Sequence, residues 1–319
     1  MTGPDVVTLG ETMVSLRTGT PLRLGGALQM SMAGSESNVA IGLARLGHSV
    51  RWGGRVGADE VGTYLLRTLR AESVLVDTVA IDPDRPTGLM LAERRINDLS
   101  RVSYYRSNSA GSALSQADAA ACLTQAPRLL HVTGITPALS DSAAAAVTEA
   151  VRLARAAGAL VSVDVNYRSK LWGIDAARVR LTELARSADI VIASDDELAL
   201  IVTDAAMLAG EAAAAAELAA SGVRAVVIKR GAHGATVYTD GQVVQAPALS
   251  VTVCDTIGAG DAFTAGYLSG LLDGLQPAEA LHRGTVTGAF AVAASGDWEG
   301  APTRAELGLL AAPAGATLR

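Results

Sequence analysis

The order of its predicted strands and helices restricts the fold of this chain more than any other feature. From about residue 114 onward, short runs rich in Val, Ile and Leu alternate with longer segments of helical periodicity. Such alternation predicts parallel strands, joined by helices that cover both faces of one sheet. The predicted strands are 5–11, 129–132, 160–165, 190–193 and 225–229, and the predicted helices are 140–157, 176–187 and an alanine-rich segment that ends at Gly222. We therefore expect an α/β fold with a doubly wound, mostly parallel sheet flanked by helices.

Two extended segments interrupt this order in the N-terminal third. Residues from about 12 to 33 alternate loosely and carry glycines, whereas Thr87 to Glu93 and Arg101 to Arg106 form a second extended pair. Insertions of this kind can pair with each other into a separate sheet, and a sheet beside a ligand site can act as a lid. We predict one domain over 1–319, with lid insertions at approximately 12–33 and 86–108.

Composition excludes several classes of protein. Half of the 319 residues are hydrophobic, yet no run reaches the roughly 18 apolar residues that a membrane-spanning helix needs. The formal net charge of −6 argues against a nucleic-acid-binding surface. The two cysteines give neither a disulfide framework nor the spacing of a metal site, and no secretion signal opens the chain. We expect a cytoplasmic protein with small-molecule ligands and with no membrane or nucleic-acid partner.

A glycine-rich turn in the C-terminal third carries the strongest chemical signal. A β-prone run over 249–253 leads into the sequence DTIGAGD at 255–261, and an apolar helical pattern follows until about Gly274. Gly258 and Gly260 therefore fall where a helix begins, and unpaired backbone N–H groups point out of that end. Because these residues have no side chains, a phosphate can approach the backbone closely.

Asp261 lies in the first turn of that predicted helix, beside the anion that the amides would hold. A carboxylate in this place is suited to accept the proton of an attacking hydroxyl during phosphoryl transfer. A glycine-rich turn capped by an aspartate explains the same residues without any ligand.

Polar residues follow other predicted strands too, at the edge where open α/β sheets bind ligands. The stretch from Gly34 to Asn38 begins a helix, and its side chains either contact sugar hydroxyls or cap that helix; taken alone, the stretch favours capping. Asp164 to Arg168 ends one strand, and Lys229 to Gly234 ends another. Ser194 to Glu197 ends a third strand and fits an acidic group near a metal as well as it fits a helix cap.

Together, these stretches resemble a known family. The order of Gly34–Asn38, Gly54–Gly62, Asp164–Arg168, Gly231–Gly234 and Gly258–Asp261 is similar to that in the ribokinase-like (PfkB) carbohydrate kinases. Within that family, 104–106, 164–172 and 296–300 resemble the 2-dehydro-3-deoxygluconate kinases. The resemblance implies ATP-dependent phosphorylation of 2-dehydro-3-deoxygluconate at its terminal hydroxyl, which gives the 6-phosphate. It also implies the fold of that family, with its small β-sheet lid.

The resemblance further implies roles for individual residues. Asp261 would be the general base, and the amides of Gly258, Ala259 and Gly260 would stabilise the transferring phosphoryl group. The sugar would contact Gly34, Asn38, Tyr104, Arg106, Arg168 and Asp261. The ATP would lie along Asn166, Ser194, Lys229, Gly231, Gly234, Asp255, Gly258 and Gly260. Mg²⁺ would neutralise the nucleotide, with Glu197 as an indirect contact, although Ser194 stands where the family often has asparagine.

The proposed sugar is an acid, so its carboxylate needs a cation. A planar guanidinium binds a carboxylate through two hydrogen bonds, which makes Arg106 and Arg168 the candidates. An ion pair within the protein is the alternative for Arg168, and a solvated strand edge is the alternative for Arg106.

Three functions remain open at this point. The chain is a kinase of an acid sugar, a kinase of a neutral sugar or nucleoside, or a sugar-binding protein without catalysis. The two arginines favour the first function, and the intact turn from Gly258 to Asp261 argues against the third. The exposed edge of a lid sheet predicts a homo-oligomer formed through the lid.

Overall fold

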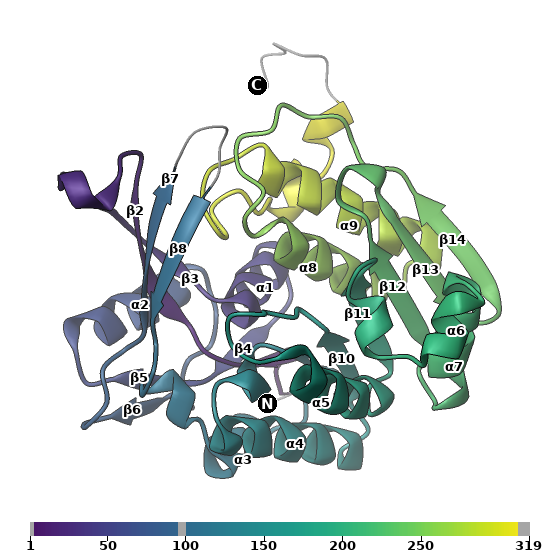
Figure 1. Cartoon of the computed structure of the whole chain (residues 1–319), viewed down its shortest axis with the longest axis horizontal. Coiled ribbons are helices and arrows are strands. Elements are labelled where there is room, and N and C mark those ends of the chain that lie inside the picture. The colour runs from purple at the N-terminus through teal and green to yellow at the C-terminus, as the bar shows by residue number, and fades with distance from the viewer. Residues whose placement is uncertain (1–2, 95–99, 312–319) are drawn as a thin grey trace.

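The computed structural model describes residues 3–94 and 100–311, and its largest element is a sheet of eight strands (Figure 1). The strands from β4 to β12 in this sheet run parallel, and the hairpin of β13 and β14 adds two antiparallel strands at one edge. In spatial order they are β14 (Gln242–Ala246), β13 (Ala235–Thr239), β12 (Ala225–Lys229), β11 (Ile190–Ser194), β10 (Leu160–Asp164), β9 (Leu129–Thr133), β1 (Val6–Leu9) and β4 (Val50–Gly53).

Helices cover both faces of this main sheet, because successive residues of a buried strand point to opposite sides. On one face, strand residues such as Leu130 and Val163 belong to a core with α3, α4, α5 and α7. On the other face, Leu129 and Ile192 belong to a core with α1, α2, α8 and α9. The helices are α1 (Ser35–Arg45), α2 (Glu60–Ala71), α3 (Gln116–Cys122), α4 (Asp141–Ala156), α5 (Ile174–Arg186), α6 (Asp204–Leu208), α7 (Glu211–Ala220), α8 (Ala259–Leu272) and α9 (Pro277–Val292).

Four strands form a smaller sheet, which we call the lid sheet (Figure 1, purple to blue). Their order is β3 (Gln29–Ala33), β2 (Met13–Thr18), β7 (Leu89–Arg94) and β8 (Ser100–Tyr105), with β2 and β7 parallel. The apolar core of the lid sheet consists of Met13, Ala33 and Met90, with Val102 packed against it. A separate short pair, β5 (Arg55–Gly57) and β6 (Ala80–Asp82), follows β4 along the chain.

The structure confirms the predicted α/β class, the mostly parallel sheet and the presence of a smaller sheet. The strands of the lid sheet come from the two predicted insertions, although residues 95–99 of the second insertion lie outside the described residues. The hairpin of β13 and β14 was not predicted. Among the residues described, no helix is both long and apolar enough to cross a bilayer.

The β-prone run over 249–253 forms no strand, because these residues have no regular structure. Pro247 directly follows β14 and lacks the backbone donor that would continue a ladder. Further on, the amide of Cys254 donates to the carbonyl of Val292 at 2.8 Å, which ties the segment to the end of α9. Val253 itself is 65% exposed, so its β propensity is not used in packing.

Candidate active site

A cavity of about 710 Å³ lies between the lid sheet and the ends of the parallel strands. Asn166 follows β10, Ser194 ends β11 and Lys229 ends β12, and all three line it. Met90 and Tyr104 line it from the lid sheet. Parallel strands bring their carboxyl ends to one edge, so residues far apart in sequence meet there.

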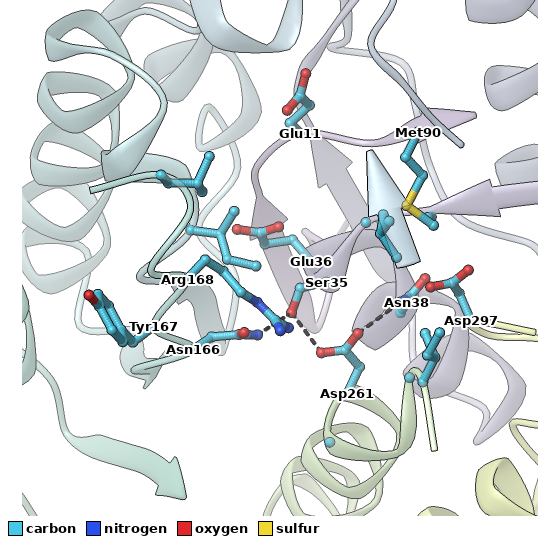
Figure 2. Close-up of a pocket in the computed structure, with 18 of the residues that line it drawn as sticks. Glu11, Ser35, Glu36, Asn38, Met90, Asn166, Tyr167, Arg168, Asp261 and Asp297 are labelled. Carbon is cyan, nitrogen blue, oxygen red and sulfur yellow. Dashed lines mark hydrogen bonds between the residues drawn. The ribbon is translucent and has the colours of Figure 1, made fainter. Parts of the chain in front are cut away.

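Asp261 is held by two side chains of α1 (Figure 2). The Ser35 hydroxyl donates to Asp261 Oδ1 at 2.6 Å, and Asn38 Nδ2 donates to Asp261 Oδ2 at 2.8 Å. Asn166 Nδ2 in turn donates to the Ser35 oxygen at 2.9 Å. The start of α8, the start of α1 and the residues after β10 are thus joined in one network, which fixes the orientation of the carboxylate.

The surroundings of Asp261 make it a stronger base than an ordinary aspartate. Burial raises the pKa of the Asp261 carboxyl, and the nearby charge of Asp164 raises it further, while the hydrogen bonds from Ser35 and Asn38 act in the opposite direction. A carboxylate with a raised pKa accepts a proton more readily from a hydroxyl. The geometry therefore suits Asp261 to proton abstraction at the cavity wall.

Lys229 forms a buried ion pair beside this network. Its Nζ lies 2.6 Å from Asp164 Oδ2, and Thr264 donates to the same oxygen at 3.3 Å. Although burial lowers the pKa of Lys229, the carboxylates of Asp164 and Glu197 raise it overall, so the ammonium stays charged. Lys229 therefore brings a fixed positive charge to the wall of the cavity.

Gly258 turns the chain into α8 with a left-handed conformation, φ 75°. A Cβ on Gly258 would lie 1.8 Å from the carbonyl oxygen of Asp297, so only glycine fits this contact. Within the described residues, the amides of Gly258 and Gly260 donate no backbone hydrogen bond. Both residues line the cavity, which makes this turn a site where an anion can replace the missing acceptors.

The two predicted arginines differ in their surroundings. Arg168 is exposed, and within the described part of the chain its side chain has neither an ion pair nor a hydrogen bond; in Figure 2 this side chain points into the cavity. Arg106 Nε instead donates to Glu11 Oε2 at 2.7 Å, and its guanidinium lies over the ring of Tyr104. Glu11 is 2% exposed, so this pair is largely screened from solvent. Arg168 is the freer of the two cations.

Most of the predicted site residues line the cavity. They are Gly34, Asn38, Tyr104, Arg106, Asn166, Arg168, Ser194, Glu197, Lys229, Gly258, Gly260 and Asp261. Four others, Ala259, Gly231, Gly234 and Asp255, lie outside its lining. Gly234 has a structural reason to be glycine, because a Cβ there would lie 2.0 Å from the carbonyl of Ala246. The carboxylate of Asp255 is bound by Arg17.

Glu197 could contact a magnesium ion bound with a nucleotide only indirectly, through water. Both oxygens of Glu197 accept backbone hydrogen bonds, from Tyr167 at 2.7 Å and from Ser194 at 2.9 Å. In the described residues, no group of three or more His, Cys, Asp or Glu side chains is arranged to hold a metal. Mg²⁺ commonly uses phosphate and water ligands with few protein groups, so a contact from Glu197 through water is consistent with this arrangement.

Several lining residues were not identified from the sequence as parts of the site. Glu36 is buried, and its Oε1 accepts hydrogen bonds of 2.7 Å from both Thr133 and Thr136. Lys170 Nζ donates to the carbonyl of Val102 at 3.0 Å and so connects the residues after β10 to the lid sheet. The position of Glu36 beside Gly34 in a polar helix start was a usable signal, whereas the contact of Lys170 depends on tertiary structure.

Comparisons with known proteins identify the family of this chain. Residues 4–304 match the model of the family described as pfkB family carbohydrate kinase. A 2-dehydro-3-deoxygluconokinase from Bacillus subtilis is 38% identical over 95% of this chain and 94% of its own length. A PfkB protein from Polaromonas sp. JS666 is 36% identical, with a TM-score of 0.85 over 96% of this chain and 99% of its own.

The same fold occurs in a kinase of another sugar. A fructokinase from Xylella fastidiosa, solved with bound ATP, is 24% identical, with a TM-score of 0.83 over 96% of this chain and 98% of its own. The fold alone therefore does not distinguish acid sugars from neutral ones. The family match and the relative at 38% identity show that this chain belongs to the pfkB family of carbohydrate kinases.

Proposed function

We propose that this enzyme phosphorylates 2-dehydro-3-deoxygluconate at its terminal hydroxyl with ATP, giving the 6-phosphate. The observation that carries the proposal is Arg168, a guanidinium that faces the cavity of Asp261 without a partner among the described residues. A neutral sugar gives such a group no counter-charge, whereas the carboxylate of an acid sugar can accept two hydrogen bonds from it. The activity of the Bacillus subtilis relative supports the same substrate.

In the proposed reaction, the terminal hydroxyl oxygen of the sugar attacks the γ-phosphorus of ATP. Asp261 accepts the hydroxyl proton as the new P–O bond forms, and the bond from phosphorus to the β–γ bridging oxygen breaks, so that ADP leaves. The amides of Gly258, Ala259 and Gly260 stabilise the charge on the transferring group, and Lys229 adds a positive charge at the same wall. A bound Mg²⁺ would neutralise the nucleotide phosphates, with Glu197 as its nearest indirect protein contact.

We propose that separate protein groups in the cavity bind the hydroxyl groups of the sugar. Asn38 Oδ1 is buried without a partner in the described residues, which leaves it available to a ligand hydroxyl. Gly34 and Tyr104 line the same cavity. The nucleotide would extend along Asn166, Ser194 and the loop from Gly231 to Gly234, with Asp255 acting through the turn that it begins.

A neutral sugar is the alternative substrate. The observation that favours it is the pairing of Arg106 with Glu11, which leaves only one of the two predicted arginines free. In that case Arg168 would bind the nucleotide or a group of the lid instead of a substrate carboxylate.

The test is an assay of ADP release with 2-dehydro-3-deoxygluconate, its galactonate-derived epimer, fructose and ribose. We expect the highest kcat/KM with an acid sugar, and a loss of roughly 30- to 1000-fold in Arg168→Ala, since a charge-assisted hydrogen bond to the carboxylate is removed. Arg180→Ala is the matched control, because Arg180 is an exposed arginine of α5 that does not line the cavity. A higher kcat/KM for fructose or ribose in the unmodified enzyme would replace the acid sugar with a neutral one.

We also propose a homo-oligomer formed through the lid sheet. Met30 on β3 and Tyr105 on β8 are exposed to 45% and 60%, and Leu24 in the connection between β2 and β3 is exposed to 72%, so the lid leaves apolar side chains in contact with solvent. Light scattering after size-exclusion chromatography should give a mass above that of one chain, and Met30→Lys with Tyr105→Lys should reduce it to one chain. A single-chain mass in the unmodified protein would refute this arrangement.

A further inference from the structure

Arg17 connects the lid sheet to Asp255 and Asp297, two residues of the C-terminal third of the chain. It lies on β2, and its Nη1 and Nη2 donate to Asp255 Oδ2 at 3.0 Å and to Asp297 Oδ2 at 2.5 Å. Its Nε donates to Ser15 Oγ at 3.2 Å, which orients the guanidinium. The three side chains of this cluster are largely buried, with 18%, 19% and 7% of the side chain exposed in Arg17, Asp255 and Asp297.

Both carboxylates that Arg17 holds are attached to the turn that would bind the phosphoryl group. Asp255 Oδ1 accepts a hydrogen bond of 3.1 Å from the amide of Ile257, one residue before Gly258. The main chain of Asp297 lies directly against Gly258, where a Cβ would come within 1.8 Å of the Asp297 oxygen. A shift of either aspartate would therefore move the amides of Gly258 and Gly260.

The loop of Asp297 is fixed from one further side. Arg45 at the end of α1 donates to the carbonyls of Glu299 and Ala301 at 3.1 and 2.6 Å. On the lid side, Ser31 of β3 donates to the Glu299 carboxylate. Among the described residues, Arg17 and Ser31 are lid residues that form hydrogen bonds with this loop, and the contacts of Arg17 also reach the glycine turn.

Charge gives Arg17 a second effect. Two carboxylates beside an anion site repel a phosphoryl group, and the repulsion is strong where water is excluded. Burial raises the pKa of Asp297 to about 6, while the charge of Arg17 and its hydrogen bond act in the opposite direction. The positive charge of the Arg17 guanidinium therefore offsets the two negative charges of Asp255 and Asp297.

We infer that Arg17 is a positioning residue for phosphoryl transfer: by holding Asp255 and Asp297, it aligns the glycine turn with the lid sheet and neutralises both carboxylates beside the transferring group. The inference rests on the proposed phosphoryl transfer but not on the identity of the sugar. It gives the segment 296–300 a role in assembling the site.

The experiment compares steady-state kinetics of Arg17→Ala, Arg17→Lys and the double variant Arg17→Ala/Asp297→Asn with those of the unmodified enzyme, using the sugar that the unmodified enzyme turns over best. We expect kcat to fall about 10- to 100-fold in Arg17→Ala, with smaller changes in both KM values, since the turn acts mainly on the transition state. Arg17→Lys should be intermediate, because an ammonium keeps the charge but cannot bridge two carboxylates. The double variant should recover part of kcat, since it removes the uncompensated charge of Asp297.

Arg152→Ala is the control, because Arg152 is an exposed arginine of α4, paired with Glu149 and remote from the cavity lining. Thermal melting of each variant identifies loss of folding, and the double variant removes the charge of the buried Asp297 carboxylate, which destabilises Arg17→Ala. Unchanged kcat in Arg17→Ala, or a higher sugar KM with normal kcat, would overturn the inference, the second result by assigning Arg17 to the lid alone. A double variant no more active than Arg17→Ala would refute the neutralising effect. If the unmodified enzyme phosphorylates no sugar, the proposed function fails instead.

Discussion

The wall of the cavity that carries Asp261 and the wall that carries Arg106 differ in the size of the sheet and of the apolar core that support them. The first, which we call the main wall, is attached to the eight-stranded sheet, whose two faces are each covered by an extensive apolar core. The second, the lid wall, rests on four strands whose core is Met13, Ala33 and Met90. A small sheet with so little buried apolar area has low local stability. The main wall therefore holds its groups in fixed positions, whereas the lid wall can adjust to a ligand.

This difference leads to an expectation for kinetics. Groups on the main wall should act on the transition state and change kcat, because their positions do not depend on the ligand. Lid groups that line the cavity should act through KM, because part of the binding free energy is used to order the lid. Arg17 is a lid residue outside the cavity lining, and it should change kcat because its contacts act on the glycine turn. Variants of each wall can distinguish the two cases, and the largest effect is expected on the main wall.

Asp261→Asn removes the base of the main wall. We expect kcat to fall by roughly 10² to 10⁴, with nucleotide affinity nearly unchanged, because the amide keeps the shape but accepts a proton poorly. Turnover measurements and calorimetric titration with ATP check the two parts separately. Turnover within about threefold of the unmodified enzyme would remove Asp261 from the role of base.

Arg106→Ala tests the lid wall. We expect a loss of roughly 30- to 1000-fold in kcat/KM for the acid sugar, mainly through KM, since a charged contact to the substrate is lost. The variant also leaves Glu11 buried without its cation, so Glu11→Gln/Arg106→Ala is the control that separates this cost from substrate binding. Arg106→Lys should recover only part of the loss. A fall in kcat with an unchanged KM would contradict the division between the walls.

Gly260→Ala adds one methyl group to the main wall. The new Cβ would lie 3.6 Å from Lys229 Nζ, an ordinary contact, and alanine favours the helix that begins here. We expect a melting temperature equal to or above that of the unmodified protein, together with a kcat lower by about tenfold, since the methyl group crowds the anion. Gly258→Ala, which clashes with Asp297, should instead lower the melting temperature. Full activity in Gly260→Ala would show that no phosphoryl group approaches this residue.

Glu36→Gln tests the stability of the main wall and should have the smallest effect. Burial raises the pKa of Glu36 from 4.5 to about 7, against the hydrogen bonds from Thr136 and Thr133. The folded protein then keeps a proton that the unfolded chain has released, so stability falls as the pH rises towards and through 7. From pH 6 to pH 8 this loss is about 1 kcal/mol, and the variant should not show it.

Urea unfolding at the two pH values measures this loss as a difference between proteins, which cancels the titration of other groups. Glu183→Gln is the control, because Glu183 is exposed on α5. An equal pH dependence in Glu36→Gln and the unmodified protein would show that Glu36 is already ionised at pH 6.

The sequence was informative where local pattern and tertiary structure agree. The parallel strands follow from short apolar runs between helices, and the glycine turn follows from its own residues, because both signals lie within about ten neighbouring positions. The run 249–253 misled for the same reason: its β propensity was real, but no strand edge was paired with it. The network of Ser35, Asn38 and Asp261 was visible only in part, since the sequence indicated a cap at Gly34–Asn38 but not its partner on α8.

The charged pairs were beyond prediction from the sequence. Nothing near Arg106 indicates that Glu11 binds it, since the two residues are 95 positions apart. Likewise, the contacts of Arg17 depend on the turn at 255–258 meeting a loop near the end of α9. Such contacts are set by how layers pack, and one sequence carries no periodic signal for them.

The contact between Arg17 and Asp297 also bears on how the protein is made. The two residues are 280 positions apart in the chain. A ribosome that adds about 5 to 20 residues per second needs roughly 14 to 56 s to synthesise the second after the first. Late in that interval the nascent chain contains the strands of the main sheet and all four strands of the lid sheet, but it still lacks the loop that joins them. We therefore expect enzymatic activity only at the end of translation, so that stalled or truncated chains remain inactive and do not consume ATP.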